Sequence, residues 1–218
     1  MVTMTTFGSR EEWLKARAGR IGGSEAAAIV GMSKWLTNVG LWELKTGRKT
    51  AEDISDNPLV KYGAAAEKYL RELFALDYPN LKVEYVENNM WLNDKYPFAH
   101  ASLDGWLEDK RSVSKLRRGI LEIKTATIMN GSQRKKWDGK LPDNYYCQVL
   151  WYMGVVEADF AVVKAQLKSG GSNTIETRHY GIEAEDVRED IDYLLNKGSE
   201  FYEYIKSDTC PPLILPNL

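Results

Sequence analysis

Two opposite charges interrupt a segment that otherwise has the composition of a buried β-strand. In GILEIKTAT, residues 119–127, Glu122 and Lys124 stand among branched and apolar residues. Because alternate residues of a strand share a face, both charges point one way while Leu121 and Ile123 point the other. From this segment alone, a solvent-exposed ion pair worth about 0 to 1 kcal/mol is the simpler interpretation. A catalytic face would need further acids to converge on it.

Two other carboxylates can reach that face. Asp104, in ASLDGW, lies one strand earlier and would approach Glu122 and Lys124 if the two strands pair, although Asp-Gly is also ordinary turn chemistry. Glu67 lies on or beside the apolar stripe of a strongly helical segment. An inward carboxylate there is costly unless it is paired, for example with Arg71, or bound to a metal ion. Both alternatives stay open for each residue taken singly.

Gln148 is a polar residue within the apolar segment YYCQVLWYM. A buried glutamine usually just satisfies its hydrogen bonds, but one that faces the charged cluster could orient water or phosphate. Three carboxylates at one spot repel each other and indicate a divalent cation, and their hard oxygen atoms favour magnesium or manganese over zinc. The main-chain carbonyl of Ile123 could supply another ligand. Such a metal activates water for phosphodiester hydrolysis, and Lys124 would help to steer and deprotonate that water.

The helices that must position these residues come mostly before the charged strand. Ser9 and Glu12 fit a capping box for a short first helix, and Ser24 is the expected N-cap of an Ala-rich second helix. A third helix is expected in GLWELKTG and a fourth in KYGAAAEKYLRELFAL. The inner stripe of the fourth helix is predicted to be Gly63, Ala66, Leu70, Leu73 and Phe74.

Three β-like runs follow, LKVEYVENNMWLN, YPFAHASLDGWLED and RRGILEIKTAT, and they predict an antiparallel meander. A helix over residues 143–155, strands in FAVVKAQL and TIETRHYGIE, and a final helix over residues 184–206 complete the chain. This order predicts an α/β fold of the mixed α+β kind, with a central mixed β-sheet flanked by helices. No low-complexity linker divides the 218 residues, so a single domain over 1–218 is expected.

Composition restricts the class of protein. Seven Trp and twelve Tyr in a chain that is 44% hydrophobic argue against disorder, and the frequent charges argue against a membrane span. The N-terminus shows no secretory signal, and two cysteines give neither a disulfide framework nor a zinc site, so a cytoplasmic location is expected. The net charge of −2 is no global nucleic-acid signature. The basic segments RSVSKLRR and QRKKWDGK are either solvated loops or local phosphate contacts.

The ordered motifs resemble those of the PD-(D/E)XK nucleases, and more narrowly the lambda-exonuclease-like phage recombination nucleases of the YqaJ type. The motifs are W-x-x-x-R-x-G-x-I-x-x-S from Trp13 to Ser24, G-x-x-x-E from Gly63 to Glu67, S-x-D-G from Ser102 to Gly105, E-x-K from Glu122 to Lys124 and Y-x-x-Q-V from Tyr145 to Val149. Each motif alone is weak, but the series is specific and covers about residues 13–160. One departure is Leu103, which stands where the motif name has proline.

The resemblance implies a restriction-endonuclease-like fold and a two-metal site. Asp104 and Glu122, with the Ile123 carbonyl, would bind one Mg²⁺ ion, for which Mn²⁺ could substitute, and Asp104 would also touch a second ion. Glu67 would lie beside them, as a ligand either directly or through water. The site is thus expected to be made of carboxylate and main-chain oxygen atoms.

The same resemblance gives roles to residues on both sides of the metal site. Lys124 and Gln148 would position the nucleophilic water. Arg17, Ser24 and Ser102 would form a pocket for the 5′-phosphate of DNA, which agrees with the ability of arginine to grip phosphate through two hydrogen bonds. Without the resemblance, Ser24 would be read only as a helix cap.

The implied function is a magnesium-dependent 5′ to 3′ exonuclease. It would degrade one strand of linear double-stranded DNA to 5′-mononucleotides and leave a 3′ single strand for a phage annealing protein in the bacterial host cytoplasm. The implied assembly is a homo-oligomer, a trimeric ring around the DNA. The alternatives are a restriction-like or repair endonuclease with the same core and a non-catalytic DNA-binding module. Lys34 beside Trp35, and Arg134 to Lys136 beside Trp137, could contact the DNA, but a surface loop whose aromatic residue is anchored in the core is the favoured interpretation of both sets. Leu59 or Val60 could act as a strand-separating wedge.

Overall fold

The computed structural model describes residues 1–111, 116–172 and 174–216. The basic segment around Lys115 therefore falls partly outside the described residues. The elements, in chain order, are β1 (Val2–Thr6), α1 (Arg10–Ala18), β2 (Ile21–Gly22), α2 (Gly23–Ile29), α3 (Asn38–Lys45), α4 (Pro58–Asp77), β3 (Leu81–Glu84), β4 (Asn89–Asn93), β5 (Ala99–His100), β6 (Gly105–Asp109), β7 (Arg117–Ile128), α5 (Gly131–Lys135), α6 (Asp143–Val156), β8 (Phe160–Ser169), β9 (Ile175–Glu183) and α7 (Arg188–Lys206).

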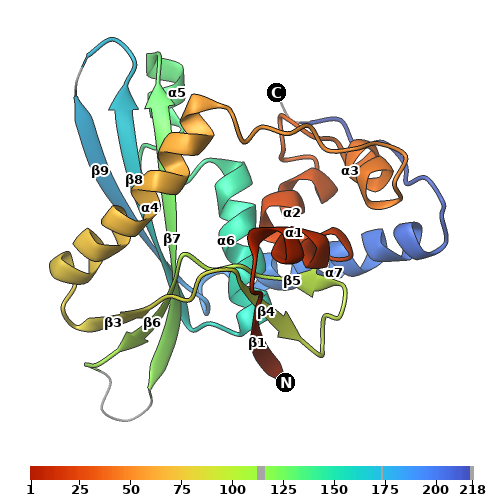
Figure 1. The fold of residues 1–218 in the computed structure, drawn as a ribbon, viewed down its shortest axis with the longest axis horizontal. Helices are drawn as coiled ribbons and strands as arrows, with labels where there is room; N and C mark the ends of the chain where they lie inside the picture. The colour runs from red at the N-terminus through yellow and green to blue at the C-terminus, as the bar shows by residue number, and fades with distance from the viewer. Residues whose placement is uncertain (112–115, 173, 217–218) are drawn as a thin grey trace.

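The central sheet has the order β3-β6-β7-β8-β9. Only the β7–β8 pair is parallel, and the other three pairs are antiparallel, so the sheet is mixed. In Figure 1 the long strands β7, β8 and β9 run side by side, α4 crosses one face of them, and α6 separates the sheet from α1, α2 and α7. The predicted fold class, a mixed sheet flanked by helices, is confirmed.

Strand β7 is buried on both faces, which explains its run of branched residues. Ile120 and Ile128 belong to the core cluster that includes α6, α2 and α7. Leu121 and Ile123 belong to a smaller cluster beneath α4. Glu122 alternates with Leu121 and Ile123 and so lies on the α6 side of the strand. Its charge is thereby placed against a helix instead of water.

Helix α4 is anchored by two of the five residues predicted for its inner stripe. Leu70 and Phe74 are 3% and 0% exposed, and truncating such buried residues to alanine typically costs about 2 to 5 kcal/mol. The prediction for Leu73 is wrong, because its side chain is 50% exposed. Asn57 caps the helix and Pro58 opens it, one turn earlier than the sequence pattern suggested.

Helix α6 is enclosed almost all round, since every residue from Cys147 to Val156 is buried. A helix that is apolar on all sides belongs in a core, and any polar side chain it carries must find a partner there. The helix lies against α2 and α7 on one side and faces β7 on the other. It therefore forms the wall between the sheet and the N-terminal helices.

Two local expectations are wrong. The predicted meander breaks at its first run, because β3 joins the central sheet while β4 turns away and pairs with β1, a strand that the sequence did not indicate. Ser24 is not the N-cap of α2. The cap is Gly22, whose N–H donates to Glu25 Oε2 at 2.9 Å, and Ser24 lies within the first turn. No helix in the described part of the chain is both long and apolar enough to cross a membrane.

Candidate active site

The register of β6 and β7 brings Asp104 to the charged strand. Gly105 is paired with Leu121 in an antiparallel ladder, so the residue before Gly105 lies beside the residues after Leu121. Asp104 Oδ2 accepts a hydrogen bond from the Ile123 N–H at 2.7 Å. The carboxylate is thus fixed to the main chain between Glu122 and Lys124.

Asn89 holds the loop that carries Asp104. Its Oδ1 accepts from the Leu103 N–H at 2.9 Å, and its Nδ2 donates to the Leu103 carbonyl at 3.0 Å. A proline at position 103 could not donate the first of these bonds, because it has no N–H. The departure from the motif name at Leu103 is therefore accommodated by a side chain from β4, which the sequence did not single out.

Glu122 is the centre of a buried hydrogen-bond network. Its side chain is 3% exposed, and Oε1 accepts from Lys124 Nζ at 2.6 Å and from Gln148 Nε2 at 2.7 Å. Gln148 in turn lies 3.3 Å from the Tyr152 hydroxyl. Glu122 Oε2 is buried and has no hydrogen-bond partner among the described residues. Burying an unpaired carboxylate oxygen is costly, which marks this atom as the place for a missing partner.

Glu67 reaches the site from α4, on the opposite side of the cleft from α6. Burial and, to a smaller extent, repulsion from the neighbouring Asp104 raise the pKa of Glu67 to about 7. Arg71 is not its hydrogen-bond partner. The Arg71 guanidinium donates to the Asp104 carbonyl at 2.5 Å and lies over the Tyr85 ring, 3.5 Å from its centre. The alternative of a simple Glu67–Arg71 pair is therefore not what the structure shows.

The carboxylates repel one another, and burial disfavours their charged forms. Burial, opposed by Lys124 and reinforced by Asp104, raises the pKa of Glu122 to about 8. Burial likewise raises the pKa of Asp104 above its usual range. Burial lowers the pKa of Lys124, but the carboxylates of Glu122 and Asp104 more than offset this, so that its pKa is raised and it stays protonated. Cationic charge is needed to ionise all three acids together.

The donor set fits a hard divalent cation. No three His, Cys, Asp or Glu side chains within the described ranges lie close enough to hold a metal by themselves. Asp104 and Glu122 would therefore need main-chain or water oxygen atoms to complete the shell, which is how magnesium is usually bound. The unpartnered Glu122 Oε2 and the mutual repulsion of the acids are what such an ion would relieve.

Arg17 and Ser24 meet beside this cluster. Arg17 Nη2 lies 3.5 Å from Ser24 Oγ, and its guanidinium lies over the Trp13 ring at 4.3 Å from the centre. Trp13 Nε1 donates to the Asn89 carbonyl at 3.0 Å, which ties α1 to the residue that holds the Asp104 loop. Ser102 Oγ is buried without a hydrogen-bond partner in the described part of the chain. The three residues predicted for the phosphate pocket thus line one cleft, and Arg17 and Ser24 contact each other.

One cleft of about 770 Å³ contains all the predicted site residues. It also contains Leu59 and Val60 at the start of α4 and Tyr145 and Tyr152 on α6. The predicted site residues in its lining are Arg17, Glu67, Ser24, Ser102, Asp104, Glu122, Ile123, Lys124 and Gln148. Residues from six elements or loops far apart in sequence therefore face a common space.

The basic segment after β7 lies outside that cleft. Trp137 is 4% exposed and packs with Tyr145 and Tyr180, so it is a core residue and cannot stack on DNA. Arg134 is paired with Glu176. Trp35, by contrast, is 88% exposed.

Two residues of the site escaped the sequence pattern. Tyr152 follows Gln148 by one helical turn, so the i, i+4 spacing could have placed it on the same face. Asn89 gave no signal, because its role depends on where β4 leaves the central sheet.

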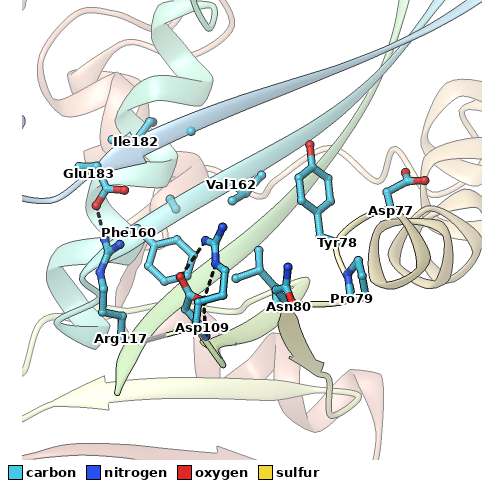
Figure 2. A pocket seen from close by; sticks show the side chains of 14 residues that line it. Asp77, Tyr78, Pro79, Asn80, Asp109, Arg117, Phe160, Val162, Ile182 and Glu183 are labelled. Carbon is cyan, nitrogen blue, oxygen red and sulfur yellow. Dashed lines mark hydrogen bonds and ion pairs between the residues drawn. The ribbon is translucent and has the colours of Figure 1, made fainter. Parts of the chain in front are cut away.

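A second charged pocket, of about 270 Å³, lies at the beginning of β7 (Figure 2). Asp109 accepts hydrogen bonds from Arg111 Nε at 2.9 Å and Nη2 at 2.8 Å, and Arg117 forms an ion pair with Glu183. The Asp109–Arg111 hydrogen bonds hold the pKa of Asp109 down at about 2. Both acids are neutralised by arginine.

Comparison with known proteins shows the family to which the chain belongs. The YqaJ-like viral recombinase domain matches residues 12–159, so the chain belongs to that family. The uncharacterized protein YqaJ of Bacillus subtilis (strain 168) is 29% identical over 195 residues, which are 89% of this chain and 56% of that protein. The chain thus spans little more than half of that relative's length.

Two solved structures share the fold. An alkaline exonuclease from Laribacter hongkongensis has a TM-score of 0.62 at 15% identity, over 91% of this chain and 93% of that one. A phage related exonuclease from Haemophilus somnus 129PT has a TM-score of 0.53 at 15% identity, over 87% and 96%. At this identity the likeness is one of fold.

Proposed function

We propose that this protein is a metal-dependent deoxyribonuclease that degrades linear double-stranded DNA from the 5′ end. The observation that carries the proposal is the convergence of Asp104, Glu122 and Lys124 in one cleft with Arg17 and Ser24. The family and the fold shared with two exonucleases support it. The products would be 5′-mononucleotides and a 3′ single strand used in recombination by annealing. The Laribacter exonuclease also has a structure in complex with dAMP, a mononucleotide.

Asp104 and Glu122 would hold the metal, with the Ile123 carbonyl, and Glu67 would contribute through water, since its carboxylate completes no compact three-acid cluster. Magnesium, or manganese as a substitute, is the cation that this oxygen set favours, and two ions are proposed. When bound, the metal supplies Lewis acidity and makes bound water a stronger nucleophile at neutral pH.

The chain's own residues would orient the reactants. Protonated Lys124, fixed by its bond to Glu122, would donate a hydrogen bond to the attacking water or the scissile phosphate. Gln148, held by Glu122 on one side, would complete the positioning of that water. Hydrogen bonds of this kind contribute by holding the reacting atoms in line, and displacement of either residue would reduce the rate.

Arg17, Ser24 and Ser102 would bind the 5′-phosphate. A guanidinium grips phosphate through two parallel hydrogen bonds, and the unpartnered Ser102 hydroxyl would add another. Leu59 and Val60 are 61% and 38% exposed at the rim of the cleft, which suits a wedge against the terminal base pair. We further propose, from the family, a trimeric ring and a phage annealing protein as partner in the cytoplasm of a bacterial host.

A restriction-like or repair endonuclease is the second candidate, because the acidic core alone would serve either activity. The pocket of Arg17 and Ser24 favours the exonuclease, since a terminal phosphate exists only at DNA ends. A non-catalytic binding module is disfavoured, because buried acids that repel phosphate would weaken binding without serving a reaction.

Three duplex substrates separate these functions. Linear DNA with a 5′-phosphate, linear DNA with a 5′-hydroxyl and closed circular DNA are incubated with magnesium or with a chelator. We expect mononucleotide release from linear ends, faster with the 5′-phosphate, and neither cutting of circles nor activity in chelator. Cutting of closed circles would instead support the endonuclease. Full activity of the Glu122→Gln variant would remove the proposed site altogether.

A further inference from the structure

Tyr152 lines the cleft that contains both the acidic cluster and the proposed phosphate pocket. It follows Gln148 by one turn of α6, is 4% exposed, and lines the same cleft as Arg17 and Ser24. Its hydroxyl is 3.3 Å from Gln148 Nε2. Because an amide nitrogen can only donate, the Tyr152 oxygen is the acceptor of this bond. The hydroxyl proton is therefore left for another acceptor.

Within the described part of the chain, no group accepts a hydrogen bond from the Tyr152 hydroxyl. Burial raises the pKa of Tyr152, so the hydroxyl keeps its proton at neutral pH. A buried tyrosine hydroxyl usually finds a partner, and an unused buried donor typically costs about 1 to 3 kcal/mol. Ser102 Oγ, in the lining of the same cleft, also lacks a hydrogen-bond partner within residues 1–111, 116–172 and 174–216. Two unused hydroxyl groups in a cleft that Arg17 also lines suit an anion.

The position of the Tyr152 ring is fixed by Gly23. A β-carbon built on Gly23 would lie 2.4 Å from Tyr152 Cε1 and 2.9 Å from the Gln148 carbonyl. Only a residue without a side chain therefore lets α6 approach the segment that carries Ser24. This close approach holds the Tyr152 ring against Gly23, the residue before Ser24, while its hydroxyl contacts Gln148.

We propose that Tyr152 is a positioning residue whose hydroxyl group donates a hydrogen bond to the terminal 5′-phosphate monoester of the DNA. This inference rests on the proposed function, and it connects the phosphate pocket to the residue that positions the water. The same hydroxyl accepts from Gln148, which is bonded to Glu122, so a phosphate in the pocket and the water-positioning amide share one hydrogen-bond chain. Phosphate binding would thus hold Gln148 in place at the acidic cluster.

The Tyr152→Phe variant tests the proposal, because it removes the hydroxyl and keeps the ring against Gly23. Values of kcat and KM are measured for mononucleotide release from linear duplex with a 5′-phosphate and with a 5′-hydroxyl. We expect kcat/KM to fall roughly tenfold or more for phosphorylated ends, as expected for one hydrogen bond to a charged group. For hydroxyl ends the fall should be less than about threefold, with the larger change in KM in the phosphorylated case.

Tyr146→Phe is the matched control. Tyr146 is on the same helix, but its hydroxyl donates to Asp190 at 2.7 Å and lies outside the cleft. This variant should keep the wild-type preference for phosphorylated ends. An unchanged preference in Tyr152→Phe, or an equal loss on both kinds of end, would overturn the proposal.

Binding separates a failure of this inference from a failure of the proposed function. Fluorescence anisotropy of labelled duplexes with either 5′ end, in chelator, measures the phosphate preference without hydrolysis. We expect the wild type to bind the phosphorylated duplex more tightly and Tyr152→Phe to lose most of that difference. A wild type that binds both ends equally overturns the role of Tyr152, whereas tighter binding without any magnesium-dependent hydrolysis contradicts only the nuclease.

Discussion

Strand β7 carries charged side chains at two places. At one place each charge is neutralised by an ion pair, and at the other a carboxylate is only partly compensated. At its beginning, Arg117 and Glu183 neutralise each other beside the Asp109–Arg111 pair (Figure 2). In its middle, Glu122 shares one oxygen between Lys124 and Gln148 and leaves the other without a partner in the described part of the chain. Neither the number of charges nor the presence of a pocket distinguishes the two places. The two places differ in the Glu122 Oε2 atom, which has no hydrogen-bond partner among the described residues.

The two places also shift pKa values in opposite directions. Hydrogen bonds from Arg111 lower the pKa of Asp109 to about 2, whereas burial and neighbouring acids raise the pKa of Glu122 to about 8. A carboxylate with a lowered pKa stabilises the fold, and one with a raised pKa destabilises it at neutral pH unless a cation compensates. We therefore expect the functional site at Glu122, where neighbouring carboxylates repel one another without full compensation, and not at the Asp109–Arg111 pair.

The largest effect should come from Lys124→Ala. Removing the ammonium that is fixed to Glu122 should lower the rate of mononucleotide release by about 10²- to 10³-fold, the range for losing one hydrogen-bond donor that stabilises the transition state. Arg117→Ala, at the other charged place of the same strand, should keep near wild-type activity per folded molecule. Comparable losses in both variants would show that the two places do not differ as described.

Glu122→Gln should abolish stabilisation by magnesium. An ion present at 10- to 100-fold above its dissociation constant should raise the free energy of unfolding of the wild type by about 1.4 to 2.7 kcal/mol. Thermal unfolding with magnesium and with chelator measures this shift. Glu183→Gln, at the neutralised place, should retain it. A magnesium shift that persists in Glu122→Gln would place the ion elsewhere.

Arg17→Ala should narrow the preference for phosphorylated DNA ends. Loss of a charge-assisted contact should reduce the ratio of rates on 5′-phosphate and 5′-hydroxyl ends by roughly tenfold. Lys15→Ala, exposed on the same helix α1, is the control and should leave the ratio as it is. An unchanged ratio in Arg17→Ala would remove this arginine from the pocket.

The smallest effect should come from Asp109→Asn. Because the folded-state pKa of Asp109 is lowered, its pairing with Arg111 stabilises the protein above the ordinary carboxyl pKa of about 3.9, and this is lost as the pH falls toward 2. Arg111 is 65% exposed, so the cost at pH 7 should stay below about 1 kcal/mol. Urea unfolding at pH 7, 5 and 3 should show the difference from wild type shrinking at the lowest pH. A difference that is constant with pH would mean that the pair contributes nothing.

Local patterns determined much of this protein. Alternation along GILEIKTAT placed Glu122 and Lys124 together, and the helical stripe fixed Leu70 and Phe74. Ser9 caps α1 as predicted, although the Glu12 side chain accepts from the Gly8 N–H and not from the Ser9 N–H of a capping box. These features depend on neighbours within a few residues, which the sequence displays directly. The resemblance to a nuclease family then predicted which residues of different helices and strands belong to one site.

Only the tertiary structure decided how those residues meet. Strand β4 pairs with β1 and not with the central sheet, so that Asn89 can hydrogen-bond to Leu103 in the loop that carries Asp104. The tertiary structure also packed Trp137 into the core, left Glu122 Oε2 without a hydrogen-bond partner among the described residues and set the Tyr152 ring against Gly23. Strand exchange between sheets, burial and hydrogen-bond satisfaction depend on contacts between segments far apart in the chain. A local pattern carries no information about those contacts, because they form only when the whole core packs.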